Sequence, residues 1–441
     1  MAGIAPGDLV GAPLQMSTSL VPTFPPLDPS ALEGVEPGMC VPCKGTKLLC
    51  GKERCPLVVR YAAAQQTSLL LEGLELQGSS PTAVFVGRMG YPKVFLGPLV
   101  AAQSGDTSLL DTPERWIGRS IDEIVAFRSQ LVRGMHRVDA LDVEGGGALV
   151  QRVRELALAR RSADVEVAFH KRPVGRLVFD DEVQPTGPTA PLRGLEVGTL
   201  RIDRRVERAH LDTDLGAAPA LVGLYRSGLE LSALQRMFSV GAFGDGRRRR
   251  FVPTRWSITA VDSTVGEHLR ERVKQLPAID QWRIHEIVAL DNRWQVVLMP
   301  SSWRYELVEA WYPNTAWNPL GREVEIISDH EFYEGRTTYA SIGGCYYAAR
   351  LAVCEHLLSQ GRQAGAFILR ETHPGYLMPV GVWNVREHVR AALRTQPKTF
   401  DRLEGVMEHL GSRLDIPLAR WTRTSALLAD ARYQRRLDDF L

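Results

Sequence analysis

The sequence predicts a mixed α/β (α+β) protein with more than one domain, and two observations support this. The chain has 441 residues, which is enough for two or three domains of about 150 residues each. Stretches that alternate between apolar and polar residues, as strands do, are interspersed with stretches of helical periodicity. Hydrophobic residues make up 44% of the chain and charged residues 24%, which is ordinary for a globular protein with a sizeable core.

Changes in composition divide the chain into five expected segments. They are a flexible leader over 1–35, a zinc-binding module over 36–60, a larger α/β domain over 61–320, a smaller C-terminal α/β domain over 321–425 and a flexible tail over 426–441. The leader is rich in proline and has no apolar periodicity. The chain has no apolar run of about 20 residues and no basic signal-peptide region, so we expect a cytoplasmic protein without a membrane segment.

Four cysteines lie close together near the N-terminus. Cys40 and Cys43 form a Cys-x2-Cys pair, and Cys50 and Cys55 form a second pair. Four thiolates at this spacing can close tetrahedrally around one zinc ion, and the lysine and arginine residues among them favour thiolates over thiols. Another metal ion or four reduced thiols are the alternatives. Because four protein ligands leave no open coordination position, we expect a structural zinc site.

Strand and helix signals alternate after the cysteines. Residues 84–86 and 94–96 are apolar runs on either side of a Gly-Tyr-Pro turn, which predicts two strands. Ser120 and Glu123 form a capping box that begins a helix. We expect the apolar face of this helix to extend to Leu131.

The same signals predict further elements along the chain. They are a helix over 148–160, a strand over 165–171, a loop over 185–194, a helix containing Leu221 and Leu224, a helix over 231–241, a hairpin over 283–300, a helix over 341–358, a strand over 362–371 and a helix over 381–393.

Two groups of residues in the second half of the chain have more than one interpretation. Asp329, His330 and Glu334 are candidate metal ligands or acid/base groups, although no second cluster of matching spacing accompanies them. Gly343 and Gly344 begin a helix. They either allow close helix packing, which is the commoner reason for such glycines, or leave N–H groups for a phosphate.

The most basic stretch of the chain is a candidate site for phosphate or nucleic acid. A glycine-rich turn over 241–246 runs into four consecutive arginines, followed by another arginine and a tryptophan. Arginine forks bind phosphate oxygens in a bidentate manner, and a neighbouring tryptophan offers a stacking face for a base. The candidate residues are Arg247, Arg248, Arg249, Arg250, Arg255 and Trp256. Because the formal net charge is only +2, affinity for nucleic acid depends on such local patches. A solvated basic loop is the alternative.

The last eight residues have the pattern Gln-x-x-Leu-x-x-Phe-Leu. This pattern resembles the peptide that docks on DNA sliding clamps (PCNA) of the archaeal and eukaryotic kind, which usually ends in two aromatic residues. One short helical turn places Leu437 and Phe440 on the same side, where they can fill an apolar pocket. The Gln434 amide would anchor the peptide, and Leu441 stands where the second aromatic residue is usual. The frayed end of an amphipathic helix is the alternative.

Several stretches together resemble the archaeal Nre family of DNA repair proteins. They are the four-cysteine cluster, GYPKVFLGPL, SADVEVAFHKRP, PTGPTAPLR, RRFVPTRWSITAVDST, GRTTYASIGGCYYAARLAVCEHL, RQAGAFILRE, PVGVWNVREHVR and the C-terminal tail. The resemblance covers most of the chain from residue 36 onward. It implies an archaeal source, a role in the repair of DNA damage and partnership with the sliding clamp. It also implies an N-terminal family domain with the zinc cluster and a shorter C-terminal domain, but it supplies no catalytic residue.

Two classes of function follow from these features. One is a repair accessory protein that binds DNA or another phosphate-bearing ligand and is recruited by the clamp. The other is a repair enzyme that acts on a nucleotide or on damaged DNA by an unknown reaction, and a structural adaptor is a weaker third. Arginines buried in a cleft would favour the enzyme, whereas an exposed basic face would favour the DNA-binding protein.

Overall fold

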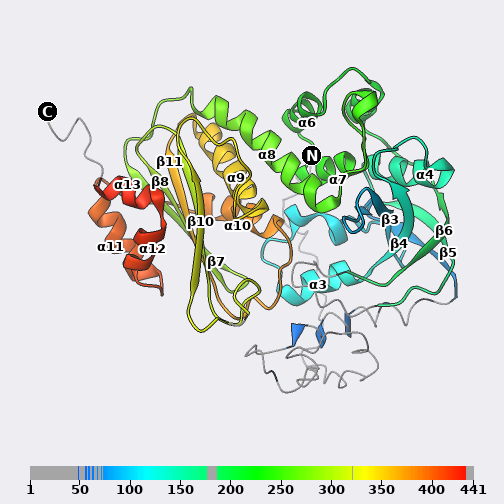
Figure 1. The fold of residues 1–441 in the computed structure, drawn as a ribbon, viewed down its shortest axis with the longest axis horizontal. Coiled ribbons are helices and arrows are strands. Elements are labelled where there is room, and N and C mark those ends of the chain that lie inside the picture. Colours follow the sequence, from blue (N-terminus) through cyan, green and yellow to red (C-terminus); the bar gives the residue numbers. More distant parts are fainter. Residues whose placement is uncertain are drawn as a thin grey trace, which may run out of the picture.

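Two β-sheets with helices between and around them form the protein (Figure 1). A computed structural model describes residues 73–175, 186–319 and 321–433, together with nine single positions between residues 48 and 71. Each sheet has six strands, and helix α8 (Thr254–Val273) runs between them. Within these residues the expected mixed α/β architecture is confirmed. None of the helices in this part of the chain is both long and apolar enough to cross a membrane.

The first sheet has the strand order β1-β5-β6-β4-β3-β2. Its strands are β1 (Glu75–Ser80), β2 (Val84–Val86), β3 (Lys93–Ala101), β4 (Leu131–Asp139), β5 (Ala163–Phe169) and β6 (Thr189–Val197). Only β4 and β6 pair in parallel, and the other pairs are antiparallel. Because β1 also pairs with β3, at Ser79 and Ala101, five of the strands close into a ring.

Helices and short 3-10 turns surround this first sheet. They are the turns Ser108–Asp111 and Pro113–Arg115 and the helices α3 (Ile121–Ser129), α4 (Gly147–Leu158), α5 (Arg204–Leu211), α6 (Ala217–Arg226) and α7 (Leu231–Ser239). The predicted capping box begins α3: the Ser120 hydroxyl accepts a hydrogen bond from the Glu123 N–H at 3.2 Å, and the Glu123 carboxylate accepts one from the Ser120 N–H at 2.8 Å.

Two local expectations for this half of the chain are wrong. Helix α3 ends at Ser129, and Leu131 begins strand β4 instead of extending the helical face. The segment 185–194 was expected to be a loop, but β6 begins at Thr189 and contains Pro191. The missing N–H of the proline is tolerated because Pro191 lies close to a register shift between β5 and β6, and its carbonyl still accepts a hydrogen bond from the His170 N–H at 2.9 Å.

The second sheet has the strand order β10-β9-β11-β8-β7-β12. Its strands are β7 (Trp282–Ala289), β8 (Asn292–Met299), β9 (Arg304–Trp311), β10 (Glu325–Glu331), β11 (Gly365–Thr372) and β12 (Lys398–Phe400). Only β9 and β11 pair in parallel. The predicted hairpin is β7–β8, and its turn is at Leu290 and Asp291, which both have positive φ. Three strands of this sheet precede residue 320 and three follow it.

Helices cover both faces of the second sheet. They are α9 (Gly344–Gln360), α10 (Trp383–Leu393), α11 (Leu403–Arg413), α12 (Leu418–Thr424) and α13 (Ala426–Tyr433). The helices α11, α12 and α13 pack on one face, where Val308 and Phe367 belong to the same hydrophobic cluster as Trp421. Since β11 is central and covered on both sides, all eight of its residues are buried.

One hydrophobic core extends across both sheets. It contains Leu96 of β3, Val265 of α8 and Ile368 of β11, with α9 and α10 contributing further residues. Helices α8 and α9 pack closely, and the Cα of Leu351 lies only 3.5 Å from where a Cβ on Gly266 would be. Burial of this apolar surface provides the main force that holds the two sheets together.

A buried ion pair connects three helices within this core. The Arg386 guanidinium of α10 donates to both carboxylate oxygens of Asp262 on α8 at 3.0 Å. The Gln235 side chain of α7 donates to the same carboxylate at 2.8 Å. Asp262 and Arg386 are completely buried. Such a pair specifies how the helices fit together, because either charge without its partner is very costly in the interior.

We predict that Asp262→Asn lowers the free energy of unfolding by about 3 kcal/mol or more, because it leaves the Arg386 charge buried without its main partner. Chemical denaturation measures this change. The matched control is Asp280→Asn, since Asp280 is 86% exposed and lies 3.5 Å from Arg283. This exposed pair is expected to contribute less than about 1 kcal/mol. Equal effects of the two substitutions would show that the buried pair has no special role.

Candidate nucleic-acid interface

The arginine run lies in a tight turn after α7, which we call the basic turn (residues 241–250). Gly241 and Gly244 both have positive φ, and a Cβ on Gly241 would lie 2.9 Å from the Arg250 carbonyl oxygen. Residues Gly246–Arg248 form one 3-10 turn, which is capped by the Asp245 carboxylate. The glycines are therefore required to fold this turn back on itself.

The four consecutive arginines have different roles in the turn. Arg247, Arg248 and Arg250 are exposed. The Arg248 side chain is 84% exposed and makes only a long 3.8 Å ion pair with Asp245. The Arg249 guanidinium instead donates to two backbone carbonyl oxygens of the protein, at 2.8 and 3.1 Å. Arg249 therefore stabilises the turn, and the other three present their charges to solvent.

Trp256 lies in the first turn of α8 beside a second exposed ring. Its side chain is 46% exposed, and its ring centre lies 5.2 Å from that of Tyr91, which is 39% exposed. Tyr91 belongs to the turn between β2 and β3. A hydrogen bond of 2.9 Å from the Val86 N–H to the Thr254 hydroxyl fixes this turn against the start of α8. Two rings far apart in sequence thus form one exposed aromatic pair.

A third exposed ring comes from the segment before α9. Tyr339 is 66% exposed, and its ring centre lies 5.4 Å from that of Tyr347. Burial on one side raises the pKa of Tyr339, while Thr259 and Arg255 of α8 oppose this shift, so Tyr339 lies close to both of them. We call Tyr91, Arg255, Trp256 and Tyr339 the α8 surface.

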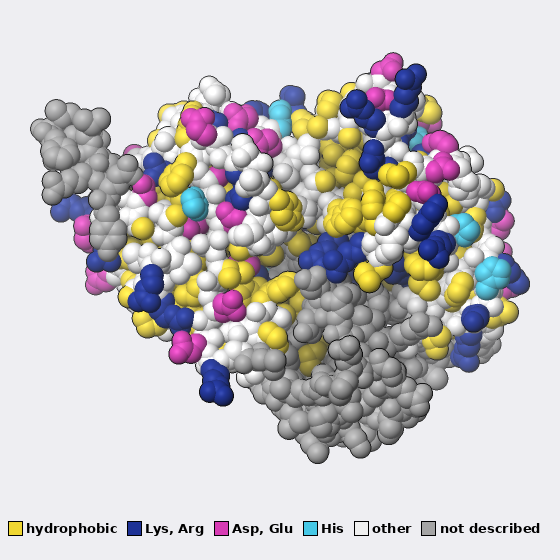
Figure 2. Space-filling view, in the orientation of Figure 1, with side chains coloured by type: hydrophobic (Ala, Val, Ile, Leu, Met, Phe, Trp, Pro, Cys, Tyr) yellow, Lys and Arg dark blue, Asp and Glu magenta, His cyan; other side chains and the backbone are white. Residues whose placement is uncertain are grey.

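The α8 surface combines the properties of a nucleic-acid platform. Exposed rings stack on bases, and arginine adds electrostatic attraction to the backbone and to ring faces. Figure 2 shows lysine and arginine side chains beside exposed hydrophobic ones near the middle of the molecule, over the region between α3 and α7. Arg255 and Trp256 were singled out from the sequence, whereas Tyr91 and Tyr339 were not. Tyr91 lies in GYPKVFLGPL and Tyr339 in GRTTYASIGGCYYAARLAVCEHL, two of the stretches that resemble the Nre family.

The paired glycines at the start of α9 allow close helix packing. A Cβ on Gly344 would lie 2.9 Å from the Thr259 hydroxyl of α8 and 3.1 Å from the Val382 side chain. Gly343 has positive φ and begins the helix. The commoner interpretation of these glycines is therefore the one that the structure supports, and it brings Tyr339 against α8.

Of the three candidates before α9, Asp329 is engaged in structural contacts, His330 lies beside it in β10, and Glu334 is exposed. The Arg336 guanidinium makes two hydrogen bonds to the Asp329 carboxylate, at 2.7 and 3.0 Å, and the Ser341 N–H makes a third at 2.6 Å. Burial opposes ionisation of Asp329, but these hydrogen bonds outweigh it and lower its pKa to about 2. Asp329 stays ionised at neutral pH and holds the segment in place. It therefore fits a structural role better than acid/base chemistry.

Two other groups that resemble catalytic or metal sites are also structural. In the described part of the chain, the one cluster with metal-ligand spacing is Glu371, His373 and Asp415. The Arg293 guanidinium donates to Asp415 at 2.7 Å and to Glu371 at 3.3 Å. Arginine thus supplies the positive charge that a metal ion would otherwise bring to these carboxylates. Burial raises the pKa of the Cys345 and Cys354 thiols, so neither is an activated nucleophile.

The zinc and clamp-docking residues lie largely outside the described residues. Cys40, Cys43 and Cys50 and the tail residues Gln434, Leu437, Phe440 and Leu441 belong to this set. Cys55 is described and is partly buried, and its carbonyl accepts a hydrogen bond from the Val59 N–H at 3.1 Å. Val59 packs with Val125 of α3 and with Leu377 and Met378.

These features define an α/β protein with two sheets joined by one hydrophobic core and an exposed aromatic and basic surface. Residues 49–318 match the family model "Archaeal Nre, N-terminal", and residues 331–440 match "Archaeal Nre, C-terminal". The chain therefore belongs to the archaeal Nre family, which confirms the resemblance seen in the sequence.

Three proteins that are named as DNA repair proteins are similar to this chain over most of its length. It is 39% identical over 405 residues to DNA repair protein NreB of Archaeoglobus fulgidus, covering 91% of this chain and 100% of the relative. It is 35% identical to DNA repair protein NreA of the same organism, covering 85% and 94% of the two chains. It is 34% identical to DNA repair protein NreA of Haloferax volcanii, covering 81% and 88%. No solved structure matches the chain.

Proposed function

We propose that this protein acts in DNA repair by binding DNA through the α8 surface and the basic turn, and that its C-terminal tail recruits it to the sliding clamp. The observation that carries the DNA-binding part is the exposed Tyr91–Trp256 pair beside Arg255. The repair role rests on the relatives, which are named DNA repair proteins. The exposure of Arg247, Arg248 and Arg250 favours a DNA-binding protein over an enzyme with a buried phosphate site.

The aromatic pair favours contact with unstacked bases. Every base has a flat face, so a ring platform binds single-stranded DNA with little dependence on sequence. Trp256 lies in the first turn of α8. This helix is held by the hydrogen bond between Val86 and Thr254 and by the buried ion pair between Asp262 and Arg386. A ring fixed in this way loses little conformational entropy when a base stacks on it.

We predict that Trp256→Ala weakens binding of single-stranded DNA by about 1–3 kcal/mol, which is roughly 5- to 160-fold, because one stacked base loses its platform. Fluorescence anisotropy of a labelled oligonucleotide measures this loss. Trp317→Ala is the matched control, since Trp317 is 45% exposed and its ring lies 6.2 Å from that of Trp311 of the second sheet, which is not part of the α8 surface. Unchanged affinity of the Trp256 variant would contradict the proposed site.

The tail has the composition and position of a clamp-docking peptide. The flexible tail was expected from residue 426, but Ala426–Tyr433 form α13, whose Leu427 and Leu428 are buried in the second core, so the docking pattern at Gln434 comes directly after a packed helix. The folded part of the chain therefore reaches to within a few residues of Gln434. A short peptide that orders on binding loses conformational entropy, so we expect micromolar affinity, on the order of −8 kcal/mol.

We predict that Phe440→Ala lowers affinity for the sliding clamp by about 2 kcal/mol or more, because the aromatic ring fills the apolar pocket. Calorimetry should show the same loss when residues 434–441 are removed, with no change in melting temperature. Asp439→Ala is the control, since this residue is adjacent to Phe440 but is not part of the docking pattern. If all of these variants bind the clamp equally, the tail is not the docking element.

We also propose that Cys40, Cys43, Cys50 and Cys55 hold one structural zinc ion. Cys55 fits this arrangement because it lies at the start of a segment whose Val59 packs against α3 and the loop before α10. Metal binding at the cysteines would anchor residues 36–60 to the folded domain at this point. Four thiolate ligands complete a tetrahedral site and leave no position for a substrate.

We predict that Cys43→Ser removes the zinc and loosens residues 36–60, while the two sheets remain folded, because the described core residues of both sheets come from Leu71 onward. Elemental analysis gives the metal content, and hydrogen exchange locates the loosened segment. Cys354→Ser is the control, since this cysteine is buried in α9 and is expected to leave the zinc content unchanged. Freshly purified protein that contains no zinc would refute the proposal.

A further inference from the structure

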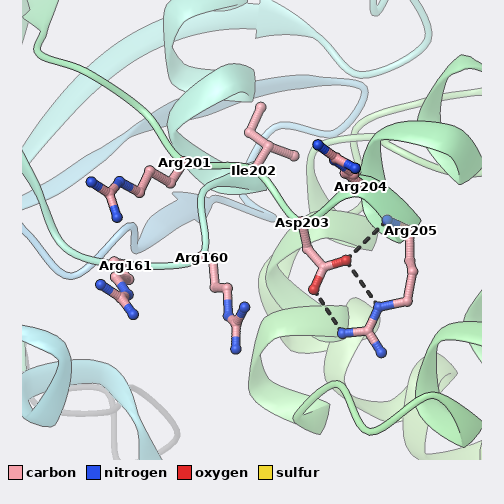
Figure 3. Close-up of a pocket in the computed structure, with 7 residues that line it drawn as sticks. All are labelled: Arg160, Arg161, Arg201, Ile202, Asp203, Arg204 and Arg205. Carbon is pink, nitrogen blue, oxygen red and sulfur yellow. Dashed lines mark hydrogen bonds and ion pairs between the residues drawn. The ribbon is translucent and has the colours of Figure 1, made fainter.

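Two segments that are far apart in sequence meet beside the first sheet, just before β5 begins and just after β6 ends. One leads from α4 to β5 and the other leads from β6 to α5. Ala159 and Ile202 form an antiparallel bridge, and the Arg160 N–H donates to the Arg201 carbonyl at 2.8 Å. Together they enclose an open hollow of about 430 Å³ (Figure 3). It is lined by Arg160, Arg161, Arg201, Ile202, Asp203, Arg204 and Arg205.

The hollow has a large excess of positive charge. Five of its seven lining residues are arginines, and the one acidic residue is Asp203. The Arg205 guanidinium binds this carboxylate with two hydrogen bonds, at 2.9 and 2.7 Å, and these bonds lower the pKa of Asp203 strongly. Figure 3 shows Arg205 folded back onto Asp203. Arg205 and Asp203 thus neutralise each other.

Four arginines remain as the charged lining, and we call Arg160, Arg161, Arg201 and Arg204 the arginine pocket. All four are exposed, and their side chains make no hydrogen bond or ion pair with the residues that the structure describes. Figure 3 shows Arg160 and Arg161 on one of the two segments and Arg201 and Arg204 on the other. The backbone pairing of Ala159 with Ile202 holds the two segments together in spite of the repulsion between like charges.

We propose that the arginine pocket is a binding site for phosphate groups, and that these belong to the backbone of the DNA bound in the proposed function. Guanidinium groups present forked donors that match phosphate oxygens, and an anion in the pocket relieves the repulsion among the four cations. The hollow is open, as access by an extended backbone requires. This inference rests on the proposed function, because the phosphate groups are those of the bound DNA. The same guanidinium groups would also bind a free phosphate compound.

The position of the pocket relative to the basic turn supports a DNA backbone as the source. Helix α5 begins at Arg204 in the pocket, and its C-terminal end contacts the basic turn: Arg249 donates to the Asp212 carbonyl at 3.1 Å. His210 makes a contact of 2.9 Å with the Ala242 carbonyl. Eight residues of helix span about 12 Å. One DNA strand carries a phosphate about every 3.4 Å, or about four over that length, so a single strand can reach both sites.

The first test measures binding of single-stranded DNA across a range of salt concentrations. The variant Arg160→Ala/Arg201→Ala keeps the backbone pairing of the two segments and removes two charges. The control Arg402→Ala/Arg423→Ala removes the same charge from exposed positions near α11 and α12. We expect the slope of log affinity against log salt to decrease by about 1 to 2 for the pocket variant, since each phosphate contact contributes up to about 1. The control should leave the slope close to that of the unaltered protein.

The second test uses inorganic phosphate and pyrophosphate as probes and measures melting temperature. A shift that the unaltered protein shows and the pocket variant lacks identifies a site that also accepts small phosphate compounds. Loss of salt slope without such a shift assigns the pocket to the DNA backbone. If the pocket variant matches the control in both tests, the proposal is refuted.

The variant Arg247→Ala/Arg248→Ala separates this inference from the proposed function. If this variant loses DNA affinity and the pocket variant does not, the arginine pocket fails while DNA binding by the basic turn stands. If the unaltered protein binds no DNA, the proposed function fails. The phosphate and pyrophosphate test then decides on its own whether the pocket binds phosphate.

Discussion

The buried ion pair between Asp262 and Arg386 determines how the two halves of this protein fit together. Helix α8 runs between the two sheets, and Asp262 is bound there by Arg386 of α10 and Gln235 of α7. A buried carboxylate tolerates only those arrangements in which its partners stay within hydrogen-bond distance. The pair therefore selects one packing of three helices, whereas apolar burial alone would accept several. The position of the exposed first turn of α8 depends on this choice.

The α8 surface exists because three chain segments converge on that first turn. The turn before β3 contributes Tyr91, α8 contributes Arg255 and Trp256, and the segment before α9 contributes Tyr339. Each is held by its own structural contact: the Val86–Thr254 hydrogen bond, the Asp329–Arg336 ion pair and the close packing at Gly344. Asp329, a candidate for acid/base chemistry, and Gly344, a candidate for phosphate binding, are part of this support.

The basic turn and the arginine pocket offer a different kind of contact from the α8 surface. The α8 surface offers rings, which suit bases, while the basic turn and the arginine pocket offer guanidinium groups, which suit phosphates. Arg249 and Arg205 show that not every arginine in these regions is available to a ligand, because both are used to hold the protein itself. The formal charge of the whole chain is only +2. Any attraction of this protein to an anionic ligand therefore depends on local clusters of arginine such as these.

The sequence by itself determined the features that depend on local rules. The capping box at Ser120, the β7–β8 hairpin, the helix over Gly344–Gln360 and the family membership all follow from residues close together in the chain. Tertiary structure alone decided which of the arginines face solvent, that Pro191 lies in a strand and that Tyr91 meets Trp256. It also brought Arg160 and Arg201 together across 41 positions of the sequence. These outcomes depend on strand pairing and helix packing between distant segments, and no local pattern of residues encodes such contacts.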